Sequence, residues 1–136
     1  MAQIPVGARA RLHLLVTGDH AVDFLGDAEA RVLATPSLIG HLELAAREAV
    51  KPHLDQGFDT VGVHVELRHL AATPLGMGVA CHAEVTGVEG RRVRFRIWAE
   101  DEQETVAEGT HERYVIDVER FAQRVTAKAQ RTGGGG

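Results

Sequence analysis

The spacing of apolar residues over positions 35–50 predicts an amphipathic helix around which the rest of the chain is organised. At about 100° per residue, one arc of roughly 140° collects the apolar side chains. These are Leu38, Ile39, Leu42, Ala45, Ala46, Ala49 and Val50. Thr35 and Pro36 indicate the start, because a threonine oxygen can cap free amides and proline lacks an N–H that the first helical position does not need. Pro52 indicates an end near Lys51, since proline disfavours helical geometry in the preceding residue.

Outside this helix, apolar and polar residues alternate with a period of two, which predicts strands. Strands are expected over 9–14, 59–70, 79–86, 92–98 and 105–118. Glu89 and Gly90 suit a tight turn between the third and fourth of them. The segment 21–33 is expected to form a mobile connection or a short helix, and 118–130 a terminal helix.

The strand patterns share one apolar and one polar face. In the second strand, Val61, Val63, Val65 and Leu67 are predicted to face the helix, with Gly62 and His64 on the other side. An antiparallel sheet with one buried and one solvated face has this signature. We therefore predict an α+β fold, with a long helix held in a curved antiparallel sheet of about five strands. Residues 1–132 are expected to form a single domain and 133–136 a flexible glycine tail.

Composition excludes several classes of protein. A chain of 136 residues with 44% hydrophobic residues suits one globular domain. A net charge of -4 gives no indication of a nucleic-acid partner. No apolar run approaches the ~20 residues needed to span a bilayer, and the N-terminus lacks the form of a signal peptide. We expect a cytoplasmic protein without a membrane partner.

Three side chains could carry chemistry on a carbonyl compound: Thr35 at the helix start, Glu43 two turns further on, and His69 near a strand end. A carboxylate can activate water or attack a carbonyl, an imidazole can move protons, and a hydroxyl can orient a reacting group. Glu43 and His69 also have structural interpretations. Glu43 and Arg47 are spaced for a surface ion pair on the helix, and an inward His69 is often only a core residue.

Other candidate sites have weaker support. No pair of histidines has a convincing metal-binding spacing, so no metal is expected. Cys81 shares an apolar strand face and is predicted to be buried rather than nucleophilic. The row Arg92, Arg94 and Arg96 could bind phosphate, but a solvated strand face is the favoured interpretation.

The run Arg68–His69–Leu70–Ala71–Ala72–Thr73–Pro74–Leu75–Gly76 before an alternating strand resembles hotdog-fold acyl-coenzyme A thioesterases. Within that superfamily the chain is similar to the fluoroacetyl-coenzyme A thioesterases. The similarity lies in Thr35 with Glu43 eight residues later, Gly62 seven residues before His69, and the segment 109–113. It extends from about Val32 to Val125.

The resemblance implies that Thr35, Glu43 and His69 form the catalytic group, and that Gly62 and Arg113 help to hold the thioester. It implies hydrolysis of an acyl-coenzyme A to the acid and free thiol. No cofactor is expected beyond the coenzyme A carried by the substrate. It also implies a homodimer, or a dimer of dimers, with active sites at the subunit interface, which would cover open sheet edges.

One segment departs from the resemblance. The fluoroacetyl-specific enzyme has phenylalanines before its catalytic threonine, whereas residues 26–31 here contain no aromatic side chain. We therefore predict a relative that acts on another acyl group. Two alternatives are a hotdog-fold enoyl-coenzyme A hydratase or dehydratase, and a non-catalytic module that binds acyl-coenzyme A.

Overall fold

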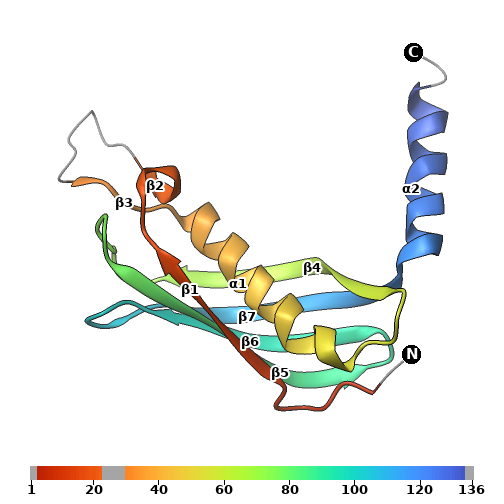
Figure 1. Cartoon of the computed structure of the whole chain (residues 1–136), viewed down its shortest axis with the longest axis horizontal. Coiled ribbons are helices and arrows are strands. Elements are labelled where there is room, and N and C mark those ends of the chain that lie inside the picture. The colour runs from red at the N-terminus through yellow and green to blue at the C-terminus, as the bar shows by residue number, and fades with distance from the viewer. Residues whose placement is uncertain (1–2, 23–29, 134–136) are drawn as a thin grey trace.

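A curved antiparallel sheet surrounds one central helix in the computed structural model, which describes residues 3–22 and 30–133 (Figure 1). The helices are α1 (Thr35–Val50) and α2 (Val118–Gly133), with short 3-10 turns at Gly18–His20 and Lys51–His53. The strands are β1 (Arg9–Leu15), β2 (Ala21–Val22), β3 (Val32–Leu33), β4 (Phe58–His69), β5 (Gly78–Glu89), β6 (Arg92–Glu100) and β7 (Thr105–Asp117). The order β1-β5-β6-β7-β4 makes β1 and β4 the edges of the main sheet. The predicted α+β architecture of five strands around a helix is confirmed.

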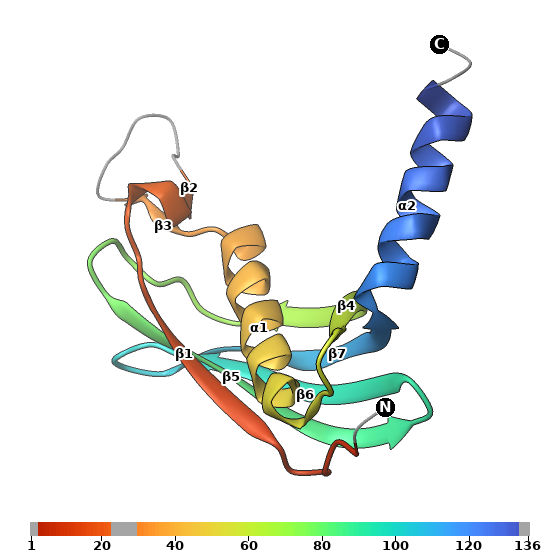
Figure 2. The same ribbon diagram turned by 45° about the vertical axis from the view of Figure 1, so that its right-hand side comes forward.

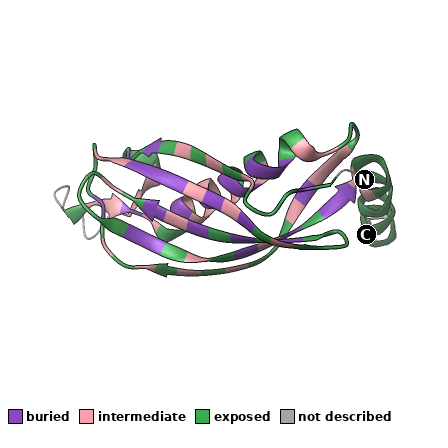
Figure 3. Cartoon of the chain, turned by 90° about the horizontal axis from the view of Figure 1, so that it is seen from below, coloured by how far each residue is buried: buried purple, intermediate pink, exposed green. Residues whose placement is uncertain are grey.

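The core lies between the concave face of the sheet and the apolar face of α1 (Figures 1 and 3). The buried residues of α1 are Leu38, Leu42, Ala45, Ala46, Ala49 and Val50. They pack in one cluster with alternate residues of β5 and β6, including Val85 and Phe95. Three alanines on this face let the helix approach the sheet closely, so burial stabilises the pair without large side chains between them. The predicted helix face is confirmed, except that Ile39 is only half-buried.

The start of α1 differs from the prediction in one respect. Ala34 is the N-cap residue, no side chain caps the helix, and Thr35 is the first helical residue. The Thr35 hydroxyl instead bonds to His69. The free amides of the first turn therefore remain without a side-chain partner. The helix end was predicted correctly, because α1 ends at Val50 and a 3-10 turn carries the chain through Pro52.

A β-bulge in β4 reverses the predicted orientation of half that strand. Gly62 pairs with Arg113 and His64 with Glu112, so Val63 is an extra residue without a partner. An extra residue shifts the alternation by one position. Val63 is consequently 54% exposed, and Gly62 rather than Val61 or Val63 faces the helix. The inward direction predicted for His69 holds, because it lies beyond the bulge opposite buried Ala107.

The segment 21–33 contains two short strands at its ends. Ala21–Val22 pairs antiparallel with Val32–Leu33, where a mobile connection or a short helix was expected. Residues 23–29, which include most of the segment without aromatic side chains, lie outside the described residues. The predicted turn between β5 and β6 is confirmed, and Gly90 adopts φ 61, which a glycine accommodates readily.

The terminal helix α2 projects from the body of the molecule (Figures 1 and 2). It follows β7 directly, and nearly all of its described side chains are exposed. It extends to Gly133, the first residue of the predicted tail, while 134–136 lie outside the described residues. Among residues 3–22 and 30–133, no helix is both long and apolar enough to cross a bilayer.

Candidate active site

Thr35 and His69 meet where the start of α1 lies beside the end of β4. The Thr35 Oγ1 lies 2.7 Å from the His69 Nδ1, although 34 residues separate them. Thr35 is held by the first turn of α1, and His69 is the last residue of β4. Because a hydroxyl can donate to a ring nitrogen, this contact fits a neutral imidazole with its proton on Nε2.

The second ring nitrogen of His69 is available for chemistry. Its Nε2 is buried and has no hydrogen-bond partner among the described residues. Burial also lowers the pKa of His69 below its ordinary value, which favours the neutral ring. A buried polar atom without a partner is uncommon, and such atoms often lie where a ligand completes the bonding.

Thr35 and His69 line an apolar pocket of about 360 Å³. The other described residues that line it are Val22, Val32, Leu33, Leu70, Ala71 and Ala72. None of these is charged or aromatic, so the pocket offers an apolar environment beside one hydroxyl and one imidazole. This composition is typical of small-molecule sites, in which a few polar groups orient a mostly apolar ligand.

Glu43 lies in a second group, where α1 faces Gly62 of β4 and Arg113 of β7. A Cβ atom built on Gly62 would lie 3.1 Å from the Glu43 Oε1, 3.3 Å from the His111 Cε1 and 3.4 Å from the Arg113 Nη1. Glycine at this position therefore lets the carboxylate approach the strand. The bulge at Val63 brings Gly62 to face Glu43, and sequence periodicity alone predicted the opposite face.

Arg113 is buried behind Glu43 and firmly bonded. Its Nε donates to the Thr60 Oγ1 at 2.7 Å, and its Nη2 donates to the Thr60 carbonyl at 2.9 Å. Only 6% of Arg113 is exposed, and burial lowers its pKa although the Glu43 carboxylate opposes that shift. The site thus places a fixed positive charge beside the carboxylate.

His111 is a site residue that the sequence did not single out, although it lies within the segment 109–113. It is fully buried, its Nδ1 donates to the His64 carbonyl at 2.7 Å, and its Nε2 lies 3.2 Å from the Arg113 Nη1. With Nδ1 as donor, Nε2 can accept from the guanidinium. Burial lowers the pKa of His111 and favours this neutral form. Its position two residues before Arg113, on the same strand face, was the only signal in the sequence.

The predicted surface pair of Glu43 with Arg47 is wrong. Arg47 instead forms two hydrogen bonds with Asp59, at 2.9 Å and 2.6 Å. These bonds lower the pKa of Asp59 to about 2. Glu43 has no hydrogen bond or ion pair with another described residue. The purely structural interpretation of Glu43 therefore loses its expected partner.

The two groups are separate within one chain. Glu43 lies eight residues along α1 from Thr35, about 12 Å at the rise of an α-helix. Gly62 lies near the middle of β4 and His69 at its end, about 20 Å apart at the usual strand spacing. The structure thus joins Thr35 with His69, and Glu43 with Gly62 and Arg113. It does not bring Glu43 into contact with the first pair.

The other candidate residues lie away from both of these groups. Cys81 is fully buried in the core, and burial raises its pKa to about 12, so it is not a nucleophile at neutral pH. Arg92, Arg94 and Arg96 are exposed on the outer face of β6, which confirms their predicted solvation. Within the described part of the chain, no three histidine, cysteine or acidic side chains gather as a metal site.

Comparison with known proteins places this chain in a family. The family described as fluoroacetyl-CoA-specific thioesterase matches residues 16–119. The chain belongs to this family. The fluoroacetyl-CoA thioesterase of Streptantibioticus cattleyicolor is 40% identical to it over 97 residues, which cover 71% of this chain and 70% of that protein.

Two solved structures have the same fold as this chain. A Thermus thermophilus protein described as a thioesterase superfamily member is 31% identical, with a TM-score of 0.90 over 98% of this chain and 99% of that one. A hot-dog-like protein from Thermanaerovibrio acidaminovorans is 31% identical, with a TM-score of 0.82 over 92% of this chain and 93% of that one. The predictions of a hotdog fold and of a thioesterase are therefore confirmed.

Proposed function

We propose that this family member hydrolyses an acyl-coenzyme A thioester to the free acid and coenzyme A. The observation that carries the proposal is the Thr35–His69 contact of 2.7 Å on the wall of an apolar pocket, at the uncapped start of a helix. The free amides of that helix start can stabilise negative charge on a thioester oxygen. A carbonyl placed there would lie beside both side chains.

Glu43, His69 and Thr35 each have a different role in the reaction. Glu43 acts as the base toward water or attacks the carbonyl itself, with the buried guanidinium of Arg113 close beside it. The neutral His69 exchanges a proton with the reacting groups through its unpartnered Nε2. The Thr35 hydroxyl orients His69 through Nδ1. In the overall reaction the carbonyl carbon gains a bond to the water oxygen, the carbon–sulfur bond breaks, and the thiolate takes a proton.

A homodimer would unite the two groups of site residues. β4 is an edge strand with backbone groups free to pair with another chain. If two copies pair antiparallel through β4 around a two-fold axis that passes midway between positions 62 and 69, Gly62 of one strand lies beside His69 of the other. Glu43 of one copy would then face the Thr35–His69 pair of the second. The separation of these groups within one chain supports this arrangement.

The pocket beside Thr35 indicates the class of acyl group. Apart from Thr35 and His69, its described lining is aliphatic, and its volume of about 360 Å³ suits a small or medium chain. None of these other lining residues offers a charged or aromatic partner for a polar acyl group. We propose an unsubstituted aliphatic acyl group rather than fluoroacetyl.

Thiol release from a panel of acyl-coenzyme A thioesters tests the proposal. We expect turnover of short to medium aliphatic thioesters, with lower kcat/KM for fluoroacetyl and charged acyl groups. Glu43→Gln should lower kcat at least a hundredfold, because it removes the base or nucleophile while keeping the shape of the side chain. Glu48→Gln, on the exposed face of the same helix, is the matched control and should retain activity.

Two results would contradict the proposal. Full activity of Glu43→Gln would exclude a chemical role for that carboxylate. Hydration of an enoyl-coenzyme A without thiol release would support the hydratase alternative instead. Analytical ultracentrifugation tests the assembly, and a monomer with full activity would overturn the shared site.

A further inference from the structure

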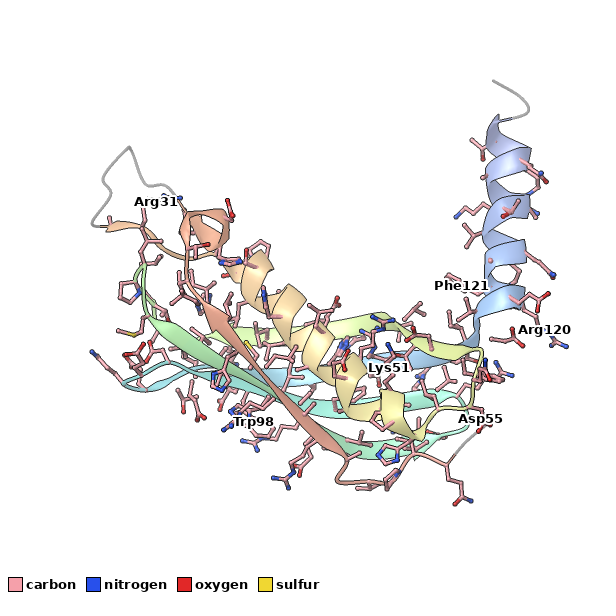
Figure 4. The ribbon with its side chains drawn as sticks, viewed as in Figure 1. Arg31, Lys51, Asp55, Trp98, Arg120 and Phe121 are labelled. Carbon is pink, nitrogen blue, oxygen red and sulfur yellow. The ribbon has the colours of Figure 1, made fainter. Side chains whose placement is uncertain are left out.

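A polar pocket lies where β7 passes into α2, apart from the residues of the proposed active site. Its volume is about 220 Å³, and three arginines line it: Arg91, Arg120 and Arg124. Tyr114 and Asp117 complete its polar lining. Arg120 points away from the body of the molecule at the base of α2 (Figure 4).

The three guanidinium groups have no anionic partner among the described residues. Some other arginines are paired, such as Arg47 with Asp59 and Arg94 with Glu112. By contrast, none of the pocket arginines forms an ion pair with a described residue. The chain as a whole carries a net charge of -4, so this local positive cluster opposes the overall balance.

The one carboxylate in the pocket already has a structural role. The Asp117 Oδ1 accepts the backbone N–H of Arg120 at 3.2 Å and so caps the start of α2. The three arginines carry three positive charges and Asp117 carries one negative charge, so the described lining has a net charge of about +2. The Tyr114 hydroxyl adds a neutral donor. The combination favours a ligand with more than one negative charge.

One residue of the pocket is a sequence neighbour of a residue of the proposed active site. Tyr114 directly follows Arg113, which lies beside Glu43 at the inner face of the same strand. Alternation along β7 places the exposed Tyr114 side chain on the outer face. A ligand held at the pocket would have to pass around the end of the sheet or the β4 edge to approach Glu43, which needs a long flexible arm.

We infer that this pocket binds the phosphate groups of the coenzyme A moiety while the pantetheine arm extends to the proposed active site. The inference rests on the proposed function, because it assumes a coenzyme A thioester as substrate. Guanidinium groups recognise phosphate through paired hydrogen bonds, and three of them around one pocket can contact more than one phosphate. The acyl group and the nucleotide are then recognised at separate places.

Isothermal titration of the full-length protein with coenzyme A, 3′,5′-ADP and pantetheine tests the inference. The double variant Arg120→Gln/Arg124→Gln should weaken coenzyme A and 3′,5′-ADP binding about tenfold, since each lost contact is exposed and modest in strength. Pantetheine, which lacks phosphates, should bind wild type and variant equally. Glutamine is a good helix former at these exposed positions, so α2 should remain folded.

Arg11→Gln/Arg131→Gln is the matched control, because it removes two exposed positive charges elsewhere and leaves the pocket intact. Coenzyme A affinity unchanged in the pocket variant, or equally reduced in the control, would overturn the inference. Equal loss of pantetheine binding would also overturn it. Titration needs no turnover, so a wild-type protein that binds coenzyme A here without hydrolysing thioesters would refute the proposed function and not the phosphate pocket.

Discussion

Replacing Gly62 by alanine tests how closely β4 and Glu43 are fitted together. The added Cβ would lie 3.1 Å from the Glu43 Oε1, where ordinary contacts begin at 3.4 Å. The carboxylate must therefore move by a few tenths of an ångström, and His111 and Arg113 stand close on the other sides. Overpacking of this kind typically costs about 1–3 kcal/mol, partly offset by about 0.4–1 kcal/mol from the stiffer unfolded chain. We expect a net destabilisation of about 1 kcal/mol.

The effect on catalysis should exceed the effect on stability. Small displacements of a reacting group can reduce rates as much as a hundredfold. We expect kcat for thiol release to fall at least tenfold in Gly62→Ala, with thermal unfolding measured on the same samples. Gly87→Ala is the matched control, because a Cβ there meets no atom within 4 Å and lies in another strand. It should leave kcat unchanged and stability equal or slightly higher.

The reasoning would be refuted by a Gly62→Ala enzyme with wild-type kcat and normal stability. That result would mean that Glu43 has room to move without consequence, so the carboxylate is not held for chemistry. A loss of stability with unchanged kcat would be equally informative. It would assign Gly62 a packing role only.

Three further predictions follow from the charged and buried groups. Because bonds from Arg47 hold the pKa of Asp59 at about 2, the pair contributes stability that is present above about pH 4 and lost as pH falls toward 2. Asp59→Asn should thus lower the free energy of unfolding by about 1 kcal/mol at pH 7, after allowance for solvent screening, and urea melts near pH 2 should show little difference from wild type. Since burial lowers the pKa of His69, kcat/KM should fall only below the ordinary histidine range as the ring is protonated, and a pH–rate profile with its acid limb above pH 7 would contradict this. Cys81, with a pKa of about 12, should react with a thiol reagent at pH 8 only after unfolding, and rapid labelling of the native protein would contradict its burial.

The sequence by itself determined the helix, the strands and most of their faces. The apolar period of 35–50 requires a helix with one buried face, and α1 has those bounds. Alternation in 92–98 requires one buried and one solvated strand face, and β6 buries Val93, Phe95 and Ile97. These features depend on local periodicity, which a single chain records directly. The inward direction of His69 followed from the same rule.

Only the tertiary structure decided which side chains of the site meet. The extra residue at Val63 is invisible to a strict alternation, yet it turns Gly62 toward Glu43. Likewise, the Thr35 hydroxyl could cap the helix, but β4 brings His69 close enough to form a hydrogen bond with it instead. Glu43 and Arg47 have the spacing of a pair, but a strand carboxylate at Asp59 is better placed for two bonds. In each case a contact between distant segments overrides a local preference, because packing fixes side-chain positions that sequence spacing leaves open.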